Sequence, residues 1–150
     1  MFVRYLCVDD KRAPPPLEHP DFGVTRNPTL DDISAAINSL DDDFIRLVIL
    51  SVAEPSGDSH FPWTGRGMLI GGGGDNGLYT CMIGMEDETT AHYLCNPDAP
   101  RTEKVEIMRG HMTDMDRKHC VDKTTLVNSV LAFAQTGEVC DVYTWETCEE

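Results

Sequence analysis

The chain has 150 residues, of which 41% are hydrophobic and 25% charged, values that are ordinary for a globular protein and exclude wholesale disorder. Its length suits a single domain over residues 1–150. A formal charge of −14, from 26 acidic and 12 basic residues, argues against a surface that binds nucleic acid or membrane and is compatible with a basic partner.

Export and membrane signals are not evident in the sequence. No apolar run approaches the ~20 residues that a membrane-spanning helix needs. The short apolar run of Phe2–Val8 is ended by Asp9 and Asp10, too early for the core of a signal peptide. We therefore expect a cytoplasmic protein whose six cysteines are reduced thiols rather than disulfides.

Residues 1–27 form a lead-in to the rest of the domain. Met1–Val8 is predicted to be an edge strand, and the four prolines within 13–20 favour an extended connector. Thr29, followed by two aspartates and apolar residues at helical spacing, predicts a helix over 29–40. The β-branched apolar run of Phe44–Val52 is typical of a central strand.

The middle of the chain predicts a series of short strands. Met68–Ile70 and Leu78–Ile83 flank an Asp75-Asn76-Gly77 turn, as in a β-hairpin. Ala91–Leu94 and Val105–Met108 are predicted as further strands. The glycines of this segment also fit the G-x-G-x-x-G spacing of a dinucleotide-binding loop, which requires a following helix. Because the residues that follow are strand-like, the hairpin interpretation is favoured.

The segment from Val121 to Trp145 is the most informative part of the sequence. Asp122 is a good N-cap, apolar residues recur at helical spacing over 122–136, and Gly137 follows where a left-handed residue ends a helix. Val139–Trp145 is then predicted to be a strand. With the elements above, this gives an α+β domain with a largely antiparallel sheet of five or six strands and two main helices.

The same segment resembles the C-terminal signature of the first-catalogued immunity-protein family of bacterial polymorphic toxin systems. In that signature a helix runs into a phenylalanine, a Thr-Gly pair, a short link and a tryptophan, and here these are Phe133, Thr136, Gly137 and Trp145. The order of the predicted elements extends the resemblance over roughly residues 28–145. One departure is the link, which usually contains a proline and here reads Glu138-Val139-Cys140.

The resemblance implies a protein that is not an enzyme and that neutralises a cognate secreted toxin by blocking its active site. Such toxins are often nucleases or nucleic-acid deaminases, whose substrate clefts should be basic, so an acidic protein would be attracted to them. We expect the contacts to lie on exposed loops. The candidate partner-binding residues are Asp41, Asp42, Asp43, Asp75, Glu86, Asp87, Glu88 and Trp63.

Two other classes of function stay open. One is a small hydrolase with Cys120 or Cys81 as its nucleophile, and the other is a regulatory module that binds a peptide at an exposed sheet edge. His92 and Cys95 suggest a metal site, but residues three apart in a strand face opposite sides. His119 and the adjacent Cys120 likewise diverge unless they lie in a turn. No catalytic, cofactor-binding or metal-binding residue is therefore assigned.

Overall fold

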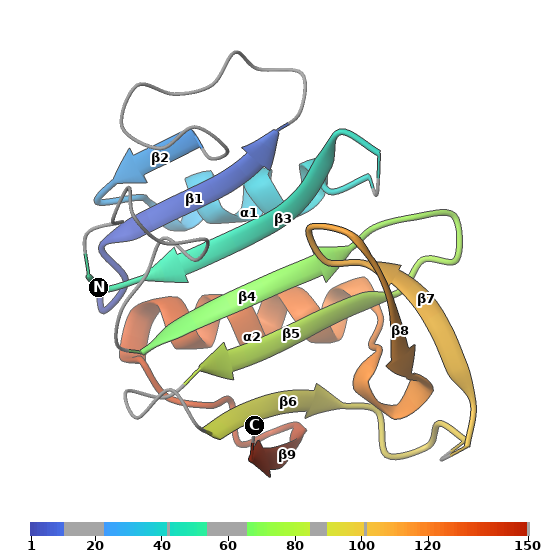
Figure 1. The fold of residues 1–150 in the computed structure, drawn as a ribbon. Helices are drawn as coiled ribbons and strands as arrows, with labels where there is room; N and C mark the ends of the chain where they lie inside the picture. The colour runs from blue at the N-terminus through green and yellow to red at the C-terminus, as the bar shows by residue number, and fades with distance from the viewer. Residues whose placement is uncertain (11–22, 42, 54–65, 85–89, 101, 150) are drawn as a thin grey trace.

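The computed structural model describes residues 1–10, 23–41, 43–53, 66–84, 90–100 and 102–149. Within these ranges, seven strands form one antiparallel sheet in the order β2-β1-β3-β4-β5-β6-β9, and two form a separate hairpin (Figure 1). The elements are β1 (Tyr5–Asp10), β2 (Gly23–Arg26), α1 (Leu30–Ser39), β3 (Ile45–Ser51), β4 (Gly67–Gly72), β5 (Tyr79–Gly84), β6 (Thr90–Cys95), β7 (Lys104–Met108), β8 (Met112–Asp116), the 3-10 helix η1 (Arg117–His119), α2 (Lys123–Thr136) and β9 (Thr144–Glu149).

Both helices cover the same face of the large sheet (Figure 1). Thr29 caps the start of α1: its side chain accepts a hydrogen bond from the N–H of Asp32, while the Asp32 carboxylate accepts one from the N–H of Thr29. Asp122 caps the start of α2, where its carboxylate accepts the backbone N–H of Thr125 at 2.8 Å, and Gly137 in the left-handed conformation caps its end. The α+β class and both predicted helices are confirmed.

The main core lies between the helices and the sheet. Phe133 from α2 and Ile33 from α1 are fully buried there, against side chains of β1, β3, β4, β5 and β6. The predicted strand Phe44–Val52 is β3, which pairs with β1 on one side and β4 on the other. Successive side chains of β3 alternate, so Val48 joins the main core and Ile49 a smaller cluster on the opposite face.

The glycine-rich segment forms the β4–β5 hairpin, as predicted. The Asn76 side chain accepts the N–H of Leu78 at 3.0 Å, and the turn residue Gly77 has φ 68°. A strand, not a helix, follows the turn, so this segment lacks the helix N-terminus on which dinucleotide binding depends.

The β7–β8 hairpin covers part of the sheet face opposite the helices (Figure 1). Ile107 and Met115 are buried beneath it, with Tyr93 of the large sheet packed against them. The hairpin touches β4 at Gly71, where a Cβ would collide with the backbone of Met108. Glycine therefore allows the two layers to approach at this point.

The number and limits of some strands differ from the prediction. Nine strands are formed in the described ranges instead of five or six. The predicted edge strand Met1–Val8 begins at Tyr5 and is internal, because β2 pairs along its outer side. β9 begins only at Thr144, since the preceding residues form a turn in which Tyr143 N–H donates to a backbone carbonyl. Trp145 therefore lies near the start of this strand and not at its end.

No disulfide joins the six cysteines, all of which lie within the described ranges. The same ranges contain no helix with the length and apolar character needed to cross a lipid bilayer.

Candidate functional site

The turn between α1 and β3 is organised by Asp41, one of the predicted partner-binding residues. Its carboxylate accepts hydrogen bonds from the backbone N–H groups of Asp43, Phe44 and Ile45 at 2.9–3.0 Å. Asp41 thus serves the structure of the turn. Asp43 and Phe44 in the same turn are exposed to solvent, and the Phe44 side chain is 45% exposed.

Three turns meet at one end of the large sheet (Figure 1). The β4–β5 turn packs on the end of α1, because a Cβ on Gly73 would collide with the carbonyl oxygen of Leu40. The β7–β8 turn lies on the start of β3, where Gly110 N–H donates to the carbonyl oxygen of Arg46 at 3.0 Å. Segments that are up to 64 residues apart are thereby brought together by backbone contacts, since the second contact joins positions 46 and 110.

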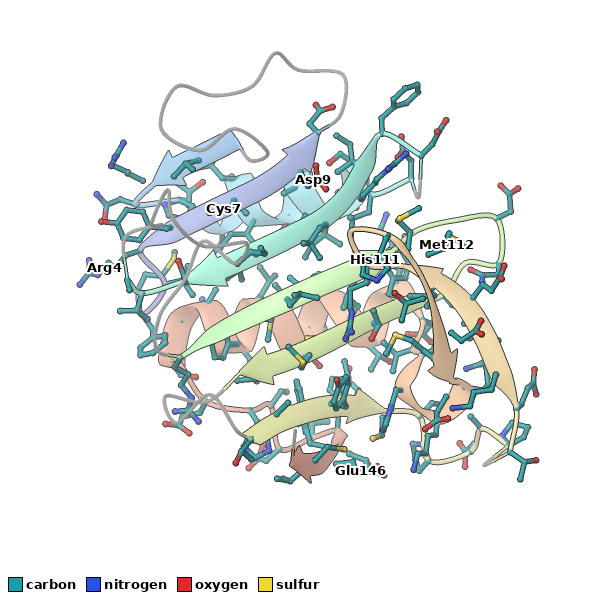
Figure 2. All side chains as sticks on the ribbon, in the orientation of Figure 1. Arg4, Cys7, Asp9, His111, Met112 and Glu146 are labelled. Carbon is teal, nitrogen blue, oxygen red and sulfur yellow. The ribbon has the colours of Figure 1, made fainter. Side chains whose placement is uncertain are left out.

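Exposed acidic and apolar side chains occur together on these turns and on the outer face of β7–β8. Met112, at the β7–β8 turn (Figure 2), is 50% exposed. We name this set the partner surface and define it as Asp43, Phe44, Asp75, Glu106, Met112 and Asp114, all of which are exposed. The other predicted contact residues, Asp42, Trp63, Glu86, Asp87 and Glu88, lie outside the described residues.

The outer face of β7–β8 contains a pair of like charges. Glu106 lies directly opposite Asp114 in the strand register, and both are exposed. The next pair on the same face joins opposite charges, with Lys104 Nζ 2.5 Å from an oxygen of Asp116. The hydrogen bond from Lys104 holds the pKa of the Asp116 carboxyl below its usual value. Like charges at opposed positions destabilise a hairpin, so the Glu106–Asp114 pair is a feature that folding alone does not favour.

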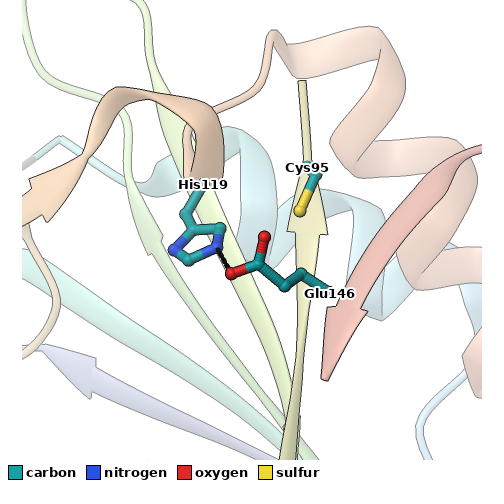
Figure 3. Close-up of side chains that lie close together, drawn as sticks. All are labelled: Cys95, His119 and Glu146. Carbon is teal, nitrogen blue, oxygen red and sulfur yellow. Dashed lines mark ion pairs between the residues drawn. The ribbon is translucent and has the colours of Figure 1, made fainter. Parts of the chain in front are cut away.

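A second candidate site lies at the β9 edge, where three metal-ligating side chain types converge (Figure 3). Cys95 ends β6, His119 ends η1 and Glu146 lies in β9. One donor atom from each lies within 4.8 Å of the other two. Nε2 of His119 lies 3.3 Å from Oε1 of Glu146. Cys95 and His119 are buried, whereas Glu146 is partly exposed.

Neighbouring groups fix the orientation of these side chains. The His119 ring stacks on Tyr93 with centroids 4.8 Å apart, and the Cys95 thiol donates to the carbonyl oxygen of Tyr93 at 3.3 Å. Lys118 Nζ lies 3.1 Å from the Glu146 carboxylate. Its hydrogen bond lowers the pKa of Glu146, while burial and then the Glu146 charge raise the pKa of Cys95 to about 11.

Two of these three residues, Cys95 and His119, were considered as site residues from the sequence, each with a different neighbour. His92 and Cys95 do face opposite sides of β6, since His92 contacts Thr147 through its ring nitrogen and Cys95 lies on the His119 side. His119 was paired with its adjacent cysteine. Glu146 is brought close to Cys95 and His119 by the pairing of β6 with β9 and by the position of η1. Neither of these features can be deduced from the spacing of residues in the sequence.

The thiols proposed as nucleophiles of a hydrolase are both buried. Cys81 has no exposed surface and lies in the main core, and burial raises its pKa well above the usual value. Burial also raises the pKa of Cys120 to about 11. Both groups are therefore neutral thiols at physiological pH, which is unfavourable for nucleophilic attack.

Comparisons with known proteins were made at the level of sequence families and of structures. No protein-family model, no curated protein and no solved structure matches this chain.

Proposed function

We propose that the protein is a cytoplasmic immunity protein that binds a cognate secreted toxin, a nuclease or nucleic-acid deaminase, and covers its active site. The observation that carries the proposal is the partner surface, where acidic and apolar side chains are exposed together on a chain of net charge −14. The resemblance of the Val121–Trp145 segment to an immunity family points to the same class of function.

The chemistry of this surface suits a basic cleft. An enzyme that acts on nucleic acid has a positively charged cleft that binds phosphate. Carboxylates such as Asp43 and Asp75 can bind in such a cleft in place of phosphate. Exposed Phe44 and Met112 add apolar contact area to the same end of the molecule. A stable complex would bury on the order of 800 Å² on each partner, so these side chains form the centre of a larger interface.

The partner surface is also held in place before any partner arrives. The α1–β3 turn is fixed by three hydrogen bonds to Asp41, and the tip of β7–β8 is fixed by the bond from Gly110. Backbone that is already ordered loses little conformational freedom on binding. Such preorganisation favours rapid association, as protection against a lethal enzyme requires.

The test is co-expression with the toxin domain encoded beside this gene. The wild-type protein should restore growth, and the double substitution Asp43→Lys with Asp75→Lys should weaken rescue. The matched control is Asp31→Lys with Asp98→Lys, which changes the net charge equally on exposed residues outside the partner surface. Equal loss of rescue by both pairs would show that only total charge matters, and absence of rescue by the wild type would remove the proposal.

Salt dependence of binding separates attraction by charge from contact by shape. The association rate should fall steeply between low and physiological ionic strength, because the Debye length shortens from about 30 Å at 0.01 M to about 8 Å at 0.15 M. The Asp43→Lys and Asp75→Lys protein should show a weaker salt dependence than the control pair. An association rate that does not respond to salt would contradict electrostatic steering.

A further inference from the structure

The Cys95, His119 and Glu146 side chains form a cluster at the β9 edge of the sheet (Figure 3). In a tetrahedral zinc site with the usual Zn–N and Zn–O bond lengths, the nitrogen and oxygen ligands are about 3.4 Å apart. Nε2 of His119 lies 3.3 Å from Oε1 of Glu146. The two atoms thus already have the separation that a shared metal ion requires.

The His119 ring nitrogen provides an independent indication that a ligand is accommodated here. The residue is only 7% exposed, and its Nε2 makes no well-aligned hydrogen bond within the described part of the chain. This atom faces the cluster (Figure 3). Its described polar contact is the 3.3 Å approach to the Glu146 carboxylate, so a ligand shared by both side chains would give this buried atom the bond that it lacks.

The arrangement differs from that of a catalytic relay. In a relay, the base uses one ring nitrogen toward the nucleophile and the other toward the carboxylate. Here Nε2 of His119 faces Glu146 on the side where Cys95 lies, while the other ring nitrogen points away from both (Figure 3). Donors that converge on one point are the geometry of metal coordination.

We propose that Cys95, His119 and Glu146 bind a divalent transition metal ion of the Zn²⁺ class, with the fourth coordination position open to solvent. Thiolate, imidazole and carboxylate are all zinc ligands, and the thiolate and imidazole pair disfavours Mg²⁺ and Ca²⁺. On binding, the Cys95 S–H bond breaks, the sulfur bonds the metal, and the proton passes to solvent. One thiolate and one carboxylate then balance the two charges of the ion.

The surroundings supply the outer contacts that such a site needs. Lys118 Nζ lies 3.1 Å from each carboxylate oxygen of Glu146, and a hydrogen bond to a ligating carboxylate fixes its orientation. Next to the cluster lies a pocket of about 280 Å³ lined by Tyr93, His119 and Cys148 among others, which gives water access to the fourth position. The metal would link β6, η1 and β9, and so add a cross-link between η1 and two strands that already pair.

The experiment is a Co²⁺ titration of the full-length protein after chelator treatment. We expect one Co²⁺ per chain, the intense visible absorption of tetrahedral cobalt, a thiolate-to-cobalt charge-transfer band, and loss of both when Zn²⁺ is added. The pale spectrum of octahedral cobalt without a thiolate band would overturn the proposal, and this readout needs no variant to fold.

Three variants assign the ligands. Cys95→Ser should abolish the thiolate band. Glu146→Gln changes a side chain that is 41% exposed and should weaken Zn²⁺ binding at least tenfold. Tenfold is the smallest loss that removal of an outer contact to a metal ligand typically causes. Cys140→Ser removes a thiol outside the cluster and should change neither. An unchanged spectrum in Cys95→Ser would refute the site. Because no toxin is used, the result is independent of the immunity proposal.

Discussion

The like-charge pair on β7–β8 allows us to measure how much charge repulsion on the partner surface lowers the free energy of unfolding. Glu106 and Asp114 are exposed and directly opposed in the hairpin. Opposed side chains place their carboxylates about 6 Å apart, where the repulsion in water is about 0.7 kcal/mol and is roughly halved by physiological salt. The adjacent Lys104–Asp116 pair presents one charge of each sign, so its effects on a substitution at Asp114 largely cancel.

We therefore predict that Asp114→Lys raises the free energy of unfolding. Repulsion of about 0.3 kcal/mol becomes attraction of the same size at physiological salt, a gain of about 0.6 kcal/mol. For a chain of this length, that corresponds to an increase of about 1–3 °C in the melting temperature. Asp114→Asn, which only removes the repulsion, should give about half the effect. If the pair serves partner binding, the same Lys variant should weaken rescue from the toxin.

The assay is urea unfolding at low and physiological salt, with both substitutions repeated in a Glu106→Gln background. The gain from Asp114→Lys should grow at low salt and largely disappear when Glu106 is neutral. A gain that survives in Glu106→Gln would arise from strand propensity and not from the charge pair. A loss of stability would refute the argument from the register.

Three further predictions concern the scaffold. Asp122 has a pKa lowered by the hydrogen bond from the helix N-terminus, so its stabilisation is present above the unfolded pKa of about 4 and is lost as pH falls through the folded pKa. Asp122→Asn keeps a side chain that can cap the helix but does not titrate. The difference in free energy of unfolding between this variant and wild type should therefore be constant at neutral pH and change below about pH 4. A difference that stays constant over the whole pH range would contradict this. Gly137→Ala should lower the free energy of unfolding by about 1 kcal/mol, because alanine is strained at the left-handed φ of this position. It should lower it by a further amount of about 1–3 kcal/mol, because the added Cβ would lie 2.7 Å from the Phe2 ring. Urea unfolding should show that Gly137→Ala costs less in a Phe2→Ala background, because only the collision with the ring is relieved. If the effects of the two substitutions simply add, the contact between them is contradicted. Alkylation of the native protein, followed by mass spectrometry, should modify partly exposed Cys140 well before buried Cys81, and comparable rates would revive the hydrolase hypothesis.

Local signals in the sequence were sufficient where one residue alone determines the backbone. Asp122 caps α2 and Gly137 ends it, and this helix was predicted to within one residue at its start. β8 was not predicted, because Met-Thr-Asp-Met-Asp lacks the composition of a strand. It is a strand because β7 pairs with it and Met115 is buried beneath the hairpin. Tertiary contacts, which no local pattern reports, decided its state.

The candidate sites follow the same division. Asp43 and Asp75 were predicted as contacts because they lie in turns, a property that is visible in the sequence. Their assembly with Met112 depends on the β7–β8 tip reaching β3, which only the fold reveals. Glu146 was not considered, because its relation to His119 depends on strand pairing across more than 50 residues.

The two candidate sites are joined through the chain. η1 follows β8 directly, so His119 lies at the base of the hairpin whose outer face bears Glu106 and Asp114. The tip is held by the Gly110 bond to β3, and the base is held where Asn96 N–H donates to the carbonyl oxygen of Lys118 at 2.7 Å. A hairpin fixed at both ends acts as a rigid support. A metal at His119 would hold the base of the hairpin more firmly. The hairpin would then have less conformational freedom to lose when a partner binds, which favours binding.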